Sequence, residues 1–132
     1  MDSDANFRAA QASWQAHSGL DRLAGADSRA LNQAFVVVTY SPDGKIQSTN
    51  FQFLRLFGCN LSEVIGQDVN RFLSKSNQRG SMNELWARLA GGKRHTEIGL
   101  WITQGGKEVW LESRFVPIMN ASGQAEAIVQ IA

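Results

Sequence analysis

The last third of the chain holds three extended segments separated by two glycine-containing turns, and this feature restricts the fold more than any other. The segments are residues 95–103, 108–118 and 125–131, and the turns are 104–106 and 120–123. Short turns join antiparallel neighbours, whereas parallel strands need a long crossover connection. The pattern therefore predicts consecutive hairpins in an antiparallel sheet.

A further hairpin is predicted near the start of the folded body. Residues 35–40 and 45–49 are rich in β-branched and aromatic side chains, which favour strands. Pro42 and Gly44 stand where a tight turn needs a fixed φ and a flexible closing residue. Together with the last three segments, this hairpin gives a predicted total of five strands.

Helix signals fill the region between the two groups of strands. Asn50 and Asn60 are predicted N-caps of two short helices, and residues 68–73 are predicted to form a single turn. Ser81 begins a capping-box pattern for a longer helix that ends at Gly91. Helices grouped in this way favour an α+β fold with a five-stranded antiparallel sheet and short helices on one face.

The N-terminal quarter differs from the rest of the chain. Residues 1–33 are polar, but Phe7 and Trp14 fall on one stripe of an amphipathic helix. We therefore predict a helical cap over residues 1–33 and a compact domain over residues 34–132. The aromatic stripe is expected to pack on that domain or on a second chain, and a frayed tail is the alternative.

The hairpin around Gly106 has two predicted registers. A two-residue loop places Trp101 opposite Trp110, whereas a three-residue loop with Gly106 in the left-handed conformation moves Trp101 onto the face of Val109. In both registers Trp110 lies beside Glu112 on the more polar face. A large aromatic side chain there predicts a covered surface.

Charge and composition exclude several functions. The net charge of +1 gives no general attraction to nucleic acid or to an anionic membrane, and no segment is long and apolar enough to span a bilayer. Cys59 is the single cysteine and is predicted to be a small buried residue. His17 and His95 are predicted to be surface residues without metal-ligand spacing. A cytoplasmic domain without catalytic activity is the expectation.

Several segments, taken in order, resemble the signatures of PAS domains, most closely those of bacterial methyl-accepting chemotaxis receptors, including aerotaxis-type ones. These segments are 50–58 (NFQFLRLFG), 61–66 (LSEVIG), 85–91 (LWARLAG) and 105–111 (GGKEVWL), with Pro117 and Gly123 after them. The resemblance covers residues 35–132 and favours the three-residue loop at Gly106. It also implies that residues 128–132 lead into a helical linker, so the chain is expected to be a fragment of a longer receptor.

The resemblance implies a pocket between the sheet and the helices, which holds FAD, FMN, haem or a small molecule in some relatives and nothing in others. Arg71 and Phe72 fit the motif of flavin-binding light sensors, but Asn70 stands where their reactive cysteine would be. Gln130 fits the last-strand glutamine that touches the flavin ring. The resemblance therefore implies candidate cofactor contacts at these four residues, without photochemical adduct formation.

Other positions count against a cofactor. Trp101 and Leu111 replace two asparagines that contact flavin in the light-sensing relatives. Asp68 stands where many chemotaxis-receptor PAS domains begin a histidine pair, so haem is less favoured than FAD or FMN. Trp86 and Trp101 are expected either to pack in the core or to line the pocket. The alternative to a cofactor contact is, for Gln130, an amide that is hydrogen-bonded within the protein or lies at the surface. For Arg71 the alternative is an ion pair at the surface.

These observations predict a sensory module that detects redox state, oxygen or a small molecule through a pocket ligand. The signal would pass to a downstream signalling domain through altered helix or dimer packing. The expected partners are that ligand and a second copy, with the homodimer formed through the N-terminal helix and the sheet face. The alternative is a cofactor-free PAS domain that serves only for dimerisation and relay.

Overall fold

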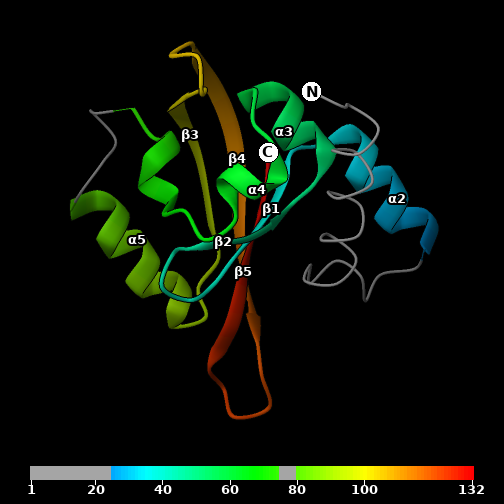
Figure 1. The fold of residues 1–132 in the computed structure, drawn as a ribbon. Helices are drawn as coiled ribbons and strands as arrows, with labels where there is room; N and C mark the ends of the chain where they lie inside the picture. Colours follow the sequence, from blue (N-terminus) through cyan, green and yellow to red (C-terminus); the bar gives the residue numbers. More distant parts are fainter. Residues whose placement is uncertain (1–24, 75–79) are drawn as a thin grey trace.

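An antiparallel sheet forms the centre of the molecule, as Figure 1 shows. The computed structural model describes residues 25–74 and 80–132. In this part of the chain the sheet has five strands in the order β2-β1-β5-β4-β3. The strands are β1 (Val37–Tyr40), β2 (Ile46–Thr49), β3 (His95–Ile102), β4 (Glu108–Met119) and β5 (Ala125–Ile131). Every neighbouring pair is antiparallel, so the predicted α+β fold is confirmed.

Helices connect the first hairpin to the last three strands. They are α3 (Phe51–Phe57), α4 (Leu61–Val64), the 3₁₀ helix η2 (Val69–Phe72) and α5 (Gly80–Ala90), while α2 (Gly25–Ala34) precedes β1. None of the helices in these described residues has the length and apolar character that a bilayer span requires. The segments α3, α4, η2 and α5 are short and pack as a layer against one face of the sheet (Figure 1).

The helix ends form where the sequence predicts them. The Asn50 side-chain oxygen accepts a hydrogen bond from the Phe53 amide at 3.1 Å, which caps α3. Gly58 ends α3 in the left-handed conformation, with φ of 71°. The Asn60 amide donates to the Glu63 carboxylate at 2.8 Å at the start of α4. The capping box predicted at Ser81 falls on side chains outside the described residues.

The two predicted hairpin loops are also confirmed. The Gly44 amide donates to the Ser41 carbonyl at 3.0 Å, which closes the turn between β1 and β2. In the second hairpin, Trp101 pairs with Val109, and Gly106 has a φ of 86°. This is the three-residue loop, which places Trp101 on the inner face of the sheet with Val109.

The start of the sheet differs from the sequence expectation. The strand predicted over 35–40 begins at Val37, because the Phe35 amide still donates to the Leu31 carbonyl at 3.1 Å and extends the last turn of α2. Gly25 is the first residue of α2, within the region predicted as a helical cap. The stripe of Phe7 and Trp14 lies outside the described residues, so its packing stays a prediction.

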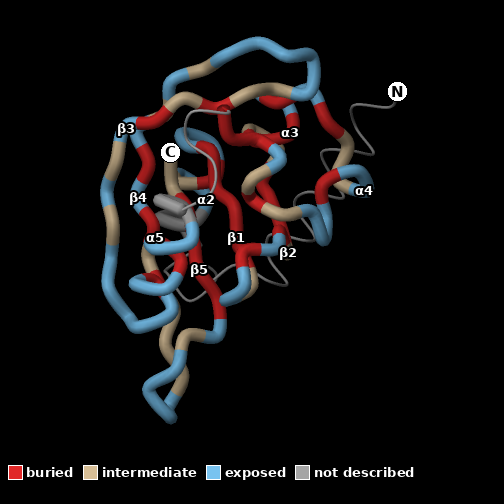
Figure 2. Tube along the Cα trace, turned by 90° about the vertical axis from the view of Figure 1, so that its left-hand side faces the viewer, coloured by how far each residue is buried: buried red, intermediate tan, exposed pale blue. Residues whose placement is uncertain are grey.

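The hydrophobic core lies between the inner face of the sheet and the short helices, where Figure 2 shows the buried residues. Its largest fully buried side chains are aromatic: Trp101, Tyr40, Phe53, Phe57, Phe72 and Phe115. Several of these rings pack edge to face, including Phe57 against Phe72 at 5.3 Å between centroids. A chain of aromatic contacts therefore joins the helices to strands β1, β3 and β4.

Candidate functional site

A buried polar cluster crosses the middle of the sheet. The Tyr40 hydroxyl on β1 donates to the Gln130 side-chain oxygen on β5 at 2.6 Å. The Gln130 amide nitrogen donates to the Ser113 hydroxyl on β4 at 2.9 Å. All three side chains lie on the inner face and are buried. The cluster therefore joins three adjacent strands through side chains, in addition to the backbone ladder.

The environment of Tyr40 keeps its hydroxyl protonated. Burial raises the pKa of Tyr40 far above its ordinary value, and the Asp68 carboxylate raises that pKa further. The Tyr40 and Trp86 rings pack edge to face, with 5.1 Å between their centroids and an interplanar angle of 86°. Trp86 in turn packs against Phe115, with 5.9 Å between the ring centroids. The hydroxyl thus acts only as a neutral donor to Gln130.

The predicted cofactor contacts separate into four environments. Phe72, Trp101 and Gln130 come together in the buried core. Leu111 is half-buried and packs against the edge of that core. Arg71 is exposed, with its guanidinium bonded to the Gln104 side-chain oxygen at 2.9 Å and 5.5 Å from the centre of the Phe72 ring. Asn70 and Trp86, the remaining two, line a separate cleft.

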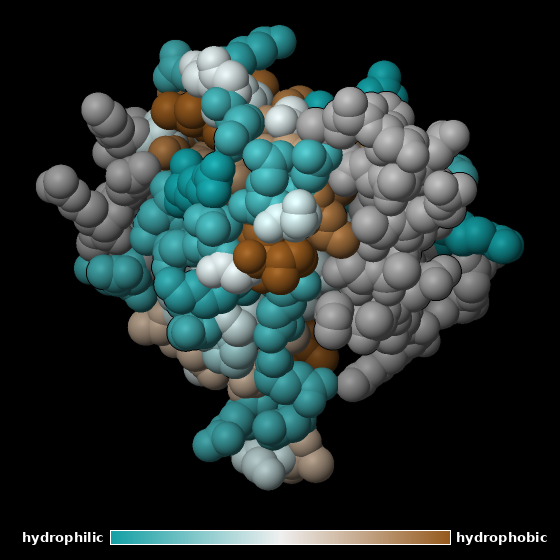
Figure 3. Space-filling view, viewed as in Figure 1, coloured by the Kyte–Doolittle hydropathy of each residue, from teal (hydrophilic) through white to brown (hydrophobic). Residues whose placement is uncertain are grey.

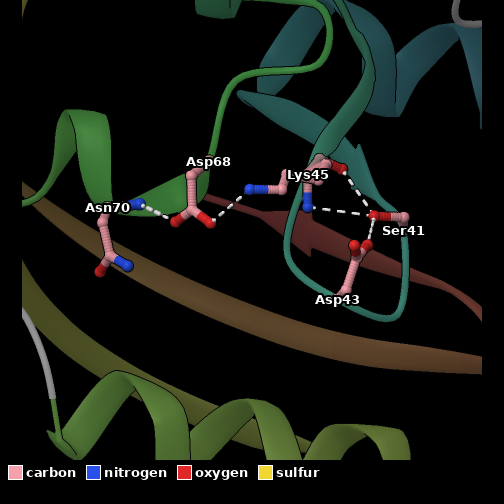
Figure 4. A network of polar contacts seen from close by, with 5 residues as sticks. All are labelled: Ser41, Asp43, Lys45, Asp68 and Asn70. Atoms are coloured by element: carbon pink, nitrogen blue, oxygen red, sulfur yellow. Dashed lines mark hydrogen bonds and ion pairs between the residues drawn. The ribbon is translucent and has the colours of Figure 1, made fainter.

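This cleft opens between the β1–β2 turn, η2 and α5, and has a volume of about 260 Å³. Its rim carries a polar network, shown in Figure 4. Lys45 forms an ion pair with Asp68 at 3.1 Å, and the second oxygen of Asp68 accepts from the Asn70 amide at 2.9 Å. Ser41 donates to the Asp43 carboxylate on the same turn. These contacts hold the turn against η2.

Trp86 forms the boundary between the cleft and the core. Only 8% of its surface is exposed, and its indole nitrogen has no hydrogen-bond partner within the part of the chain that the structure describes. A methyl group added at Gly44 would lie 3.3 Å from this nitrogen, so the glycine permits a close approach. A buried donor without an acceptor is costly, and this one lies at the wall of a cleft.

Sequence reasoning missed two members of the polar cluster. Tyr40 lies two residues after Val38 on β1 and shares its face, so its inward direction could be read from the strand pattern. Its pairing with Gln130 depends on β1 lying next to β5, with 90 residues between the partners. Ser113 shares the face of Val109 on β4, but nothing in the sequence indicates its polar partner. Strand order, which the sequence did not specify, was the missing information.

The described residues do not fit a flavin ring. Gln130, the expected flavin contact, already uses its oxygen on Tyr40 and its nitrogen on Ser113. Trp101 is 1% exposed, and its ring centroid lies 6.4 Å from that of Phe57. Packed side chains therefore fill the space that a flavin ring would need. A ring could enter only if these hydrogen bonds broke and this indole moved.

Haem and metal binding lack ligands among the same residues. His95, the one histidine in the described ranges, lies on the edge strand with its Nε2 3.8 Å from the Glu97 carboxylate. No group of three metal-ligating side chains occurs in those ranges. Cys59 is buried as predicted, and burial, followed by the Glu63 carboxylate, raises the pKa of its thiol. The thiol is therefore held in its unreactive form.

This architecture, a five-stranded antiparallel sheet with short helices on its inner face, is that of a PAS domain. Residues 28–132 match the PAS fold family, and the chain belongs to that family. Among curated proteins it is similar to the biofilm dispersion protein BdlA of Pseudomonas aeruginosa. The two are 28% identical over 104 residues, which cover 78% of this chain and 25% of the relative. The chain thus spans about a quarter of the length of that relative.

Solved structures show the same fold. The PAS domain of a protein from Colwellia psychrerythraea gives a TM-score of 0.70 at 21% identity, over 80% of this chain and 91% of that one. An RNA-binding light-oxygen-voltage receptor gives 0.69 at 24% identity, over 86% and 34% of the two chains. A light-oxygen-voltage domain studied with a flavin analogue gives 0.68 at 20% identity, over 80% and 82%. At these identities the likeness concerns the fold.

Proposed function

We propose that the chain is a sensory module of a chemotaxis-type signalling protein, and that it responds to a small molecule rather than to a flavin or haem. Membership of the PAS family supports the sensory role. The similarity to a biofilm dispersion protein supports a place within a larger signalling protein. In this proposal the module acts in the cytoplasm, has no catalytic step of its own, and passes its signal to a downstream domain.

The observation that carries the proposal is the contact between Trp86 and the buried polar cluster. Trp86 lies against Tyr40, and the Tyr40 hydroxyl is bonded to Gln130, the next-to-last residue of β5. A ligand that contacts Trp86 differently in two packing states would shift the population between them. The displacement would reach β5 through the Tyr40–Gln130 hydrogen bond, and β5 is the strand that leads to the C-terminal end of the domain.

Reconstitution tests the choice against flavin and haem. The purified chain would be mixed separately with FMN, FAD and haem, passed through gel filtration and examined by absorption spectroscopy. We expect no flavin or haem absorption band to remain with the protein at one equivalent. The reason is that the Gln130 amide is bonded to Ser113 and the buried Trp101 side chain fills the core beside it. A flavin or Soret band that co-elutes at one equivalent would replace this proposal with the cofactor-bound alternative.

A second candidate is a cofactor-free domain for dimerisation and relay. Its support is the outer face of the sheet, where Ile98 and Trp110 are each 70% exposed. Exposed apolar side chains of this size on neighbouring strands are typical of a surface that packs on a partner. Self-association and small-molecule sensing are compatible in one module, so a dimer alone would not decide between the two candidates. Ligand binding at Trp86 would distinguish the sensory module from the cofactor-free relay domain.

A further inference from the structure

We propose that the cleft between the β1–β2 turn, η2 and α5 binds a small uncharged molecule that presents a carbonyl oxygen to the Trp86 indole N–H. This inference rests on the proposed function and specifies its ligand class and site. The cleft has a volume of about 260 Å³, enough for a single-ring compound. It lies beside the filled aromatic core, with Trp86 as the shared wall.

The need for an acceptor comes from Trp86 itself. Its indole can only donate, and this donor is buried without an acceptor in the described part of the chain. Leaving a buried donor unmatched costs free energy, which a ligand oxygen in hydrogen-bond reach would recover. The nitrogen is covered by Gly44, so binding requires a small movement of the indole relative to the turn. That movement would displace Tyr40, whose ring packs edge to face with the indole.

The charges around the cleft disfavour an anionic ligand. Asp43 and Asp68 both line it, and no cationic side chain is among its described lining residues. Lys45 pairs with Asp68 from outside the lining and leaves the carboxylate of Asp43 without a balancing positive charge in the cleft. A carboxylate or phosphate ligand would be repelled, whereas a neutral carbonyl would not.

The remaining lining side chains suit a ring with polar and apolar edges. Asn70 and Asn83 face the cleft from η2 and α5, and their amides can donate or accept hydrogen bonds. Figure 4 shows the Asn70 side chain extending from η2 on the side of α5. Val69, Ala87 and Ala90 supply apolar contacts. Cyclic amides and aromatic carboxamides combine these features.

A matched pair of probes tests the site in the full 132-residue chain. Nicotinamide and nicotinate have nearly the same shape, but only nicotinate is anionic, and 2-pyrrolidone serves as an unrelated neutral lactam. We expect nicotinamide and 2-pyrrolidone to shift the Trp86 indole N–H signal in ¹H–¹⁵N NMR spectra. Nicotinate should bind about tenfold more weakly than nicotinamide, a difference of about 1.4 kcal/mol.

Variants identify the groups responsible. Trp86→Phe keeps an aromatic ring but removes the donor, and it should weaken nicotinamide binding about tenfold. Trp110→Phe makes the same change on the outer face and should leave binding unaltered. Asp43→Asn should strengthen nicotinate binding several-fold relative to nicotinamide binding. If Trp86→Phe does not fold, Asn83→Asp on the exposed side of α5 should selectively weaken nicotinate.

Three results would overturn the inference. The first is the absence of any Trp86 shift with both neutral probes at about 10 mM, the weak limit for a specific small ligand. The second is nicotinate binding as tightly as nicotinamide, and the third is nicotinamide binding by Trp86→Phe at wild-type strength. A colourless protein with an unresponsive Trp86 would refute this site and leave the proposed function standing. A retained flavin or haem would refute the proposed function itself.

Discussion

At the scale of single residues, Gln130 shows how the chain meets the polar demand of its own interior. A buried amide needs both a donor and an acceptor partner, and Gln130 finds them in Ser113 and Tyr40. The resemblance to flavin-binding PAS domains implies that the same side chain would there form hydrogen bonds with the cofactor. In this chain the hydroxyl groups of two neighbouring strands take that role, which removes the energetic reason for a polar ring to enter.

Tyr40 gives a prediction about stability at high pH. Burial, and then the Asp68 carboxylate, raises the pKa of Tyr40 in the folded state, whereas the unfolded chain has a tyrosine pKa of about 10. Above that value the unfolded state loses a proton that the folded state keeps, so stability is complete below about pH 10 and falls as the pH rises further. Urea midpoints measured from neutral to strongly alkaline pH should show this decline.

The spectroscopic form of this prediction uses one absorbance signal, because Tyr40 is the single tyrosine of the chain. Tyrosinate absorbance should appear together with unfolding and not before it. Tyr40→Phe should flatten the alkaline fall in the urea midpoint. A tyrosinate signal that develops at about pH 10 in the folded protein would contradict the prediction.

Trp101 and His95 lie on the same strand and face and give a second prediction at this scale. Trp101 is 1% exposed, so Trp101→Ala should cost about 3–5 kcal/mol in the free energy of unfolding. His95 is only half-buried, and His95→Ala should cost less than about 1 kcal/mol. Urea denaturation of both variants measures the difference. Equal losses would mean that Trp101 is not part of the packed wall.

At the scale of elements, Asn50 connects three segments that are distant in sequence. Its side-chain oxygen accepts from the amides of Phe53 and Val37, both at 3.1 Å. Its side-chain nitrogen donates to the carbonyls of Asn32 at 3.1 Å and Phe35 at 2.7 Å. One fully buried amide therefore caps α3 and fixes the end of α2 against the start of β1.

Asn50→Ala should therefore be far more damaging than removal of an ordinary cap. It leaves several buried backbone groups without partners, and we expect a loss of about 3–5 kcal/mol in the free energy of unfolding. Asn60 is the matched control, because it caps α4 near the surface, and Asn60→Ala should cost about 1 kcal/mol. Chemical denaturation compares the two. Similar losses would show that the contacts of Asn50 with α2 contribute little.

The contrast between these two asparagines shows what the sequence could predict. Both caps were predictable, because a cap depends on neighbours three residues away. The contact of Asn50 with Asn32 was not, because it depends on where α2 lies in space. In the candidate site, the inward position of Trp101 followed from the loop at Gly106. The partners of Gln130 depended on strand order, and the cleft at Trp86 depended on how a turn, a 3₁₀ helix and α5 meet.

At the scale of the whole molecule, the two faces of the sheet differ. The inner face is closed by the short helices and the aromatic core. The outer face of β3 and β4 exposes Ile98 and Trp110, with Glu112 and Arg114 beside them. On the face turned to the viewer in Figure 3, by comparison, hydrophobic colour forms separate small patches in a mainly hydrophilic surface. The expected cover over Trp110 is the stripe of Phe7 and Trp14, from the same chain or from a second chain, and it stays a prediction.

A homodimer through this outer face gives the last prediction. We expect the sedimentation coefficient of the chain to rise with concentration, because pairing would bury Trp110 and Ile98, and large aromatic side chains dominate such interfaces. Trp110→Glu should weaken association by about tenfold or more by placing a charge there. Leu56→Glu is the matched control, since Leu56 is an exposed apolar residue of α3, away from this face. Trp14→Ser tests whether the N-terminal stripe contributes. A wild-type chain that stays monomeric at all concentrations, or a Trp110→Glu variant that associates normally, would rule out this interface.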